Sequence, residues 1–90
     1  MHAVVIRATI GEPELAHKGL QEQVVPRVSN APGLVAAYWT RSDDKTNGVA
    51  MIVFESEEAA RAAADQLGSA PPPDTVTLDS VEVREVVANL

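Results

Sequence analysis

The segment from Pro32 to Leu67 constrains the fold of this 90-residue chain more than any other stretch. Pro32-Gly33 suits the centre of a type II turn, because proline fixes φ near −65° and glycine accepts the positive φ that follows. An aromatic-bearing strand, a polar turn and a second strand ending at Phe54 come next. Ser56 is a good N-cap for the alanine-rich helix after it. The segment predicts a strand–turn–strand–helix unit.

Hydrophobic periodicity places the other elements around this unit. Strands are expected at 2–10, 34–41, 48–54 and 75–87, and helices begin at Pro13 and after Ser56. The order β-α-β-β-α-β predicts a ferredoxin-like α+β fold, a four-stranded antiparallel sheet with both helices on one face. Ninety residues suit one domain, spanning 1–90.

Proline leaves the first helix open to two interpretations. Pro26 has no N–H and crowds the preceding turn, so the helix either ends near Val25 or kinks and continues to about Val28. Farther along, Pro71-Pro72-Pro73 predicts a stiff extended spacer before the last strand.

The face that Trp39 occupies depends on the length of the hairpin loop. A two-residue loop at Asp44-Lys45 places Trp39 opposite Ala50, on the helix side of the sheet. A loop longer by one residue reverses the assignment. The two-residue version is slightly favoured, and it leaves Tyr38 on the open face.

The sheet face away from the helices is predicted to be apolar, with Val5, Met51 and Val53 among its residues. A chain this short buries only about 60–65% of its unfolded surface, so a partner subunit is a common remedy. A second copy of the chain, packed sheet against sheet, is the simplest cover. The sequence therefore predicts a homodimer.

Composition excludes several classes of function. The net charge of −6 argues against nucleic-acid partners, whose phosphates need clustered Lys and Arg. The absence of cysteine excludes thiol chemistry, and His2 and His17 lack the local spacing of metal ligands. We therefore predict no metal and no cofactor. No run approaches the roughly 18 apolar residues of a membrane span, so a cytoplasmic protein is expected.

The candidate ligand-binding residues are polar or aromatic and fall near strand ends or on the first helix. Each also has a plainer interpretation: a lone tryptophan among alanines often fills a core, and His17 suits a solvated helix edge. No nucleophile–base pair has recognisable spacing, so catalytic residues are not assigned. The candidates are Arg7, His17, Asn30, Tyr38, Trp39, Arg41 and Phe54.

Two of these candidates are arginines with expected carboxylate partners. Arg7 falls on an otherwise apolar strand face, so it should pair with Glu82 or Glu85 of the last strand. Arg41 should pair at the surface with one of the two aspartates that closely follow it. Such an exposed pair contributes only about 0–1 kcal/mol.

The Pro32–Leu67 segment, with flanking strands of matching type, resembles the dimeric α+β barrel superfamily. The nearest likeness is to small proteins related to antibiotic-biosynthesis monooxygenases. The cues are Pro32-Gly33-Leu34 leading into an aromatic-bearing strand, and the run FESEEA from Phe54 leading into a helix. The resemblance implies a dimer with a ligand cleft between the sheet and the helices.

The resemblance says less about activity. Relatives of known chemistry oxidise polyaromatic substrates without a cofactor, or degrade haem. Their strand-to-helix junction commonly carries a tryptophan where this chain has Phe54, and the next helix carries a histidine where this chain has Ala63. The haem-degrading branch also has an asparagine early in the first strand, whereas the first asparagine here is Asn30. The residues for haem ligation are therefore missing.

Three functional hypotheses follow. The leading one is a small-molecule-binding homodimer related to the cofactor-independent monooxygenases. The second is an active monooxygenase on an aromatic or polyketide-like substrate, positioned by Asn30, Tyr38, Trp39 and Arg41. The third is a structural or regulatory dimer whose cleft is filled by its own side chains. An open cleft lined by Trp39, Phe54 and His17 would favour binding, and a collapsed cleft would favour the structural role.

Overall fold

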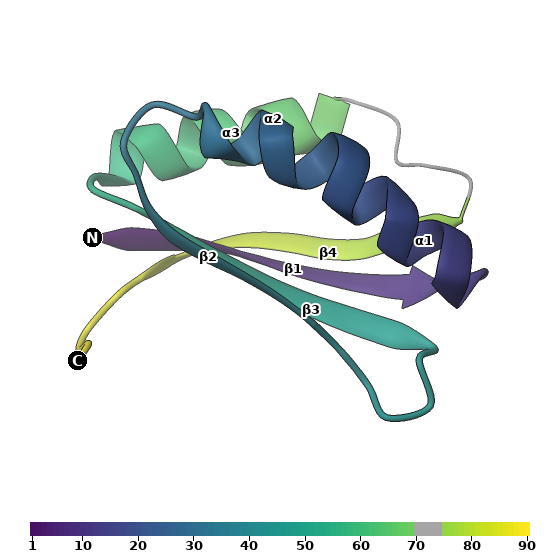
Figure 1. Cartoon of the computed structure of the whole chain (residues 1–90). Helices are drawn as coiled ribbons and strands as arrows, with labels where there is room; N and C mark the ends of the chain where they lie inside the picture. The colour runs from purple at the N-terminus through teal and green to yellow at the C-terminus, as the bar shows by residue number, and fades with distance from the viewer. Residues whose placement is uncertain (70–74) are drawn as a thin grey trace.

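The chain forms a four-stranded antiparallel sheet with all its helices on one face (Figure 1). The computed structural model describes residues 1–69 and 75–90, so the predicted triple-proline spacer lies outside the described residues. The sheet order is β2-β3-β1-β4, which is the predicted ferredoxin-like arrangement. Within the described ranges, no helix is long and apolar enough to cross a membrane. The elements are β1 (His2–Ile10), α1 (Pro13–Gly19), the π-helix η1 (Leu20–Val24), α2 (Val25–Ser29), β2 (Leu34–Arg41), β3 (Asn47–Phe54), α3 (Glu57–Ser69) and β4 (Val76–Glu85).

The first helical segment consists of α1, η1 and α2 and continues past Pro26. Of the two predictions for this helix, the one that ends it near Val25 is therefore wrong. The chain adapts through a π turn, in which the Val25 N–H donates to the Leu20 carbonyl oxygen. A π turn lengthens the helical hydrogen bond by one residue and places the proline early in the next α-helical turn, where its missing N–H matters least. The helix ends at Ser29.

The β2–β3 hairpin has the register that a turn centred on Asp44-Lys45 predicts, with Trp39 paired to Ala50. The turn is wider than two residues. The Ser42 N–H donates to the Asn47 carbonyl oxygen (2.8 Å), and the Lys45 N–H donates to the Ser42 carbonyl oxygen (2.9 Å). The added residues are symmetric about the centre, so the faces of both strands are unchanged.

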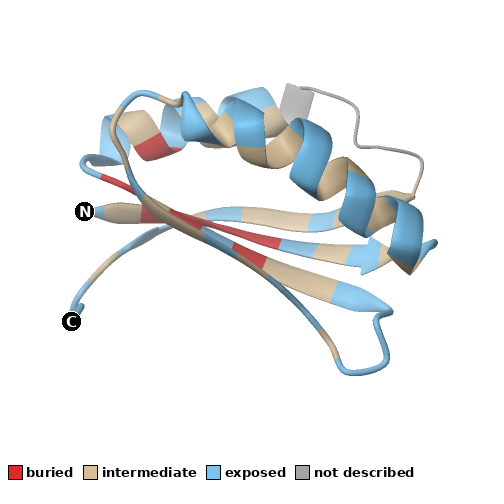
Figure 2. Cartoon of the chain, viewed as in Figure 1, coloured by how far each residue is buried: buried red, intermediate tan, exposed pale blue. Residues whose placement is uncertain are grey.

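The core lies between the middle of the sheet and α3. Val4, Ile6, Ile52 and Phe54 are buried on the sheet, and Ala60 is buried on α3 (Figure 2). Apart from Phe54 these are small or β-branched residues, and the alanine on α3 lets the helix pack close to the strands. This core holds α3 against the sheet. The first helical segment, by contrast, has no buried residue.

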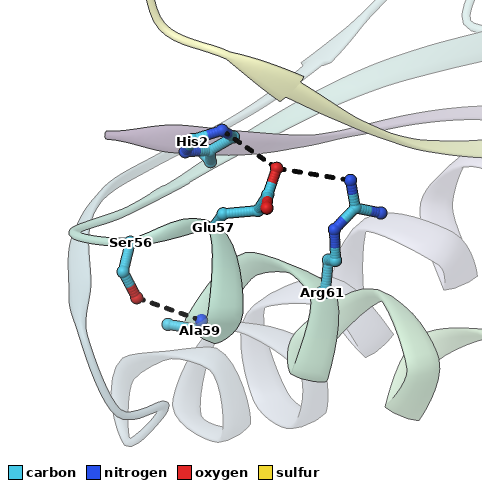
Figure 3. A network of polar contacts seen from close by, with 5 residues as sticks. All are labelled: His2, Ser56, Glu57, Ala59 and Arg61. Carbon is cyan, nitrogen blue, oxygen red and sulfur yellow. Dashed lines mark hydrogen bonds and ion pairs between the residues drawn. The ribbon is translucent and has the colours of Figure 1, made fainter.

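The start of α3 is fixed by polar contacts that Figure 3 shows. The Ala59 N–H donates to the Ser56 Oγ (3.1 Å), which confirms Ser56 as the N-cap. Glu57 in the first turn contacts both Arg61 Nη2 (3.3 Å) and His2 Nε2 (3.5 Å). The beginning of β1 and the beginning of α3 are therefore joined by one carboxylate.

Candidate functional site

A cleft of about 500 Å³ lies between the first helical segment and the sheet. Ligand sites for drug-sized molecules typically measure roughly 300–1,000 Å³, so this volume suits an organic ligand. The walls are mainly aliphatic and come from β1, the first helical segment and β4, including Ile6, Ile10, Leu20, Val24, Val28 and Leu78.

The cleft explains why the first helical segment has no buried residue. Its apolar residues are predicted from their spacing to face the sheet, and Leu20, Val24 and Val28 do line the cleft. All three are only partly covered. Leu20 and Val24 border the cleft, and Val28 borders it while also packing against the core. The π turn falls on this wall, and Leu20, Gln21 and Val24 all belong to η1. Such π turns are frequent at functional sites.

Three of the seven predicted candidates meet at the cleft. Trp39 lines it from β2, half-buried and packed against the core. His17 lines it from α1, and Arg41 lines it from the end of β2. Both His17 and Arg41 are also exposed, which places them at the rim.

The other four candidates lie elsewhere. Phe54 is 1% exposed and belongs to the core. Tyr38 is 65% exposed and pairs with Met51 on the open face of the sheet. The Asn30 side-chain amide donates to the Pro26 carbonyl oxygen (3.1 Å) at the end of α2. Arg7 is exposed on β1, on the same face as Tyr38.

The expected arginine pairs are wrong. Glu82 contacts Arg84 (2.6 Å) instead of Arg7, because Arg84 lies two residues away on the same strand face. Arg7 faces Val49 and Ser80 across the sheet. Arg41 also has no ion pair within residues 1–69 and 75–90.

Asp44 is held inside the turn and is not available to Arg41. Its Oδ1 accepts hydrogen bonds from the Ser42 hydroxyl (2.7 Å), the Thr46 hydroxyl (2.7 Å) and the Thr46 N–H (3.1 Å). These donors, Ser42 first, lower the pKa of the Asp44 carboxyl group below its ordinary value. The carboxylate thus stabilises the turn that sets the hairpin register.

The structure adds lining residues that the sequence interpretation left out, chiefly Gln21 and Arg27. Both are exposed on the first helical segment, so they belong to the rim. A signal for Arg27 was present, because it follows Leu20 by seven residues and Val24 by three, which is the spacing of one helix face. Arg27 was not predicted to line the cleft, because an arginine normally indicates the solvent-exposed face of a helix.

Among the described residues, the rim carries two arginines and one histidine and no carboxylate. Arg27, Arg41 and His17 line the cleft, and no Asp or Glu among the described residues does. The described residues also contain no cluster of three His, Asp or Glu side chains suited to a metal ion. The arrangement can therefore enclose an apolar group and donate hydrogen bonds to a polar group at its edge.

No family model and no curated protein matches the sequence. Solved structures do match. A monooxygenase from the gene ActVA-Orf6 of Streptomyces coelicolor, in complex with the ligand nanaomycin D, has a TM-score of 0.61 and 21% identity, covering 99% of this chain and 90% of that one. A dimeric ferredoxin-like protein from an uncultured marine organism has a TM-score of 0.65 and 13% identity, covering 100% and 98%.

A third match is the heme-degrading protein Rv3592 from Mycobacterium tuberculosis in its heme-free form. Its TM-score is 0.57 and its identity is 26%, with 100% of this chain and 99% of that chain covered. These matches span nearly the full length on both sides. The chain therefore shares its fold with these proteins, as the resemblance of its sequence to the dimeric α+β barrel superfamily implies.

Proposed function

We propose that this chain is a single-domain cytoplasmic protein that works as a homodimer and binds a small apolar or aromatic molecule in the cleft. The observation that carries the proposal is the cleft itself, about 500 Å³ and mainly aliphatic, with Trp39 in one wall. An aromatic ligand could stack on the indole ring while aliphatic side chains cover its edges. This volume supports binding over a cleft filled by the protein's own side chains.

Mass spectrometry of ligands retained by the natively purified protein tests this function. The wild-type protein is expected to carry an organic molecule, or to bind aromatic probes with saturation. The Ala16→Phe variant should weaken that binding, because Ala16 lines the cleft and the added phenyl ring would occupy part of the space for a ligand. Ala62→Phe is the matched control, since Ala62 is exposed on α3 and does not line the cleft. Equal binding by wild type and Ala16→Phe would contradict the proposal.

The homodimer is supported by the exposed apolar side chains of the open sheet face. Tyr38 is 65% exposed and Met51 is 45% exposed, and the two are paired across β2 and β3. Val5 lies on the other side of Met51 in the same row. A second copy packed on this face would remove Tyr38 and Met51 from water. The similar protein from a marine organism is itself described as dimeric.

Monooxygenation is the second candidate, and the structural likeness to the Streptomyces coelicolor monooxygenase favours it. Conversion of a phenol ring to a quinone by one O₂ places one oxygen atom on the ring and releases the other as water. The substrate itself supplies the four electrons, so no cofactor is required. Trp39, His17 and Arg41 would position such a substrate, because these three of the predicted candidates line the cleft.

Oxygen uptake with a panel of phenolic polyaromatic compounds tests the enzyme hypothesis. The rate should fall at least about tenfold, or about 1.4 kcal/mol, in Trp39→Phe and in His17→Ala. Tyr38→Phe is the control, because Tyr38 lies on the face away from the cleft. The absence of uptake across the whole panel would leave binding alone as the function.

A further inference from the structure

The charges around the cleft differ in sign from the charge of the chain. The whole protein carries a net charge of −6, with thirteen acidic and seven basic side chains. The cleft nevertheless has Arg27, Arg41 and the titratable His17 at its rim, and no described carboxylate in its lining. The acidic residues of the first helical segment, Glu14 and Glu22, are exposed and do not line it.

We infer that the cleft takes an amphiphilic anion, a flat apolar body with one carboxylate that lies at the rim formed by His17, Arg27 and Arg41. The inference deepens the proposed binding function and rests on it. The aliphatic walls and Trp39 receive the apolar body, and the two guanidinium groups receive the carboxylate. Arginine suits this role because its planar fork of N–H donors matches the geometry of a carboxylate.

The two rim arginines are free to bind such a group. Among the described residues, Arg61 is paired with Glu57 and Arg84 is paired with Glu82. Neither Arg27 nor Arg41 forms an ion pair or a side-chain hydrogen bond within the same residues. A ligand carboxylate would therefore replace water around these guanidinium groups without breaking an internal ion pair.

The rim arginines attract a ligand carboxylate, whereas the net negative charge of the protein repels it. The distance between the charges determines which of the two interactions is stronger. Charges separated by more than about 8 Å are largely screened at physiological ionic strength. A carboxylate in contact with a guanidinium group at about 3–4 Å is attracted far more strongly than it is repelled by screened distant charges. The rim should therefore prefer an anion even though the whole protein is acidic.

Three ring-matched probes test this preference by isothermal titration calorimetry: 2-naphthoate, 2-naphthamide and 2-naphthylmethylammonium. They share the same two-ring body and carry charges of −1, 0 and +1. We expect naphthoate to bind at least about fivefold more tightly than naphthamide, and the ammonium compound to bind most weakly. If only the net charge of the protein mattered, the order would be the reverse.

Variants that each remove one positive charge test whether Arg27 and Arg41 cause the preference for the anionic probe. Arg27→Gln and Arg41→Gln should each weaken naphthoate binding by about threefold or more and leave naphthamide binding unchanged. Arg61→Gln and Arg84→Gln are matched controls, because both arginines are exposed and lie outside the cleft. Circular dichroism of each variant checks that the fold is retained.

Salt dependence gives a second measurement that needs no variant. Added salt should weaken naphthoate binding if the nearby arginines attract it, and should strengthen it if the distant carboxylates repel it. Equal affinities for the three probes, or naphthoate binding that strengthens with salt, would overturn the inference and leave the binding function standing. Failure of all three probes to bind would overturn both.

Discussion

Trp39 lies directly opposite Ala50 in the β2–β3 ladder, and its indole ring packs against the core while also lining the cleft. The small side chain of Ala50, which is buried beside it, leaves room for the ring on the helix side of the sheet. The two interpretations of this tryptophan, core filling and pocket wall, therefore both describe it. Trp39 therefore belongs both to the packing that stabilises the fold and to the wall of the cleft.

This double role predicts the effect of truncating the indole. Trp39→Ala should lower the free energy of unfolding by about 2 kcal/mol, less than the 3–5 kcal/mol of a fully buried tryptophan because the ring is only half-buried. Urea unfolding followed by circular dichroism measures this. Leu15→Ala is the control, since Leu15 is 56% exposed on α1 and its truncation should change stability little. Equal losses in the two variants would show that Trp39 is not part of the core.

A charge placed on the open sheet face should separate the proposed dimer. Met51 sits between Tyr38 of β2 and Val5 of β1, in the middle of this face. Met51→Lys would bury a lysine in the interface, so the variant should sediment as a monomer at micromolar concentration while the wild type sediments as a dimer. Ala62→Lys, on the exposed side of α3, should stay dimeric. A monomeric wild-type protein would refute the dimer itself.

The N-cap of α3 offers a test of helix stability away from the cleft. Ser56→Ala removes the hydroxyl that accepts the Ala59 N–H, and should lower the free energy of unfolding by about 1 kcal/mol. Ser56→Asp keeps an acceptor at this position and should retain most of that stability. Ligand binding should be unaffected in both variants, because Ser56 does not line the cleft.

Stability should depend on pH through Asp44. Hydrogen bonds from Ser42 and Thr46 favour the ionised form, so the pKa of Asp44 is lower in the folded than in the unfolded protein. The stabilisation is therefore fully present above the unfolded pKa of about 3.9 and is lost as the pH falls through the folded pKa. Asp44→Ala should be less stable than wild type at pH 6, and the difference should narrow below pH 4.

Urea unfolding at a series of pH values measures that difference. Asp43→Ala is the matched control, since the Asp43 carboxylate forms no hydrogen bond among the described residues and is exposed. A stability difference between wild type and Asp44→Ala that stays constant from pH 6 to pH 3 would mean that the carboxylate charge does not hold the turn.

The amino-acid sequence by itself determined the local structure and, through it, the fold. Gly33 has the positive φ (77°) that the Pro-Gly turn requires, Ser56 caps α3, and the parity of the hairpin loop sets the face of Trp39. Each of these depends on residues close together in the chain. Short-range steric and hydrogen-bonding rules predict the turn and the cap, and they reduce the face of Trp39 to the length of one loop. The alternation of strands and helices then restricted the topology to one arrangement.

Only the tertiary structure decided the cleft and its rim. Arg27 of α2 and Arg41 of β2 are brought to one cavity by the way the first helical segment lies over the sheet, and Phe54 is taken into the core instead. The ion pairs of the arginines likewise depend on which side chains come within reach of each other. Glu82 pairs with Arg84 on its own strand and does not pair with Arg7. Such outcomes depend on distances between segments that are remote in sequence. Rules based on neighbouring residues do not predict those distances.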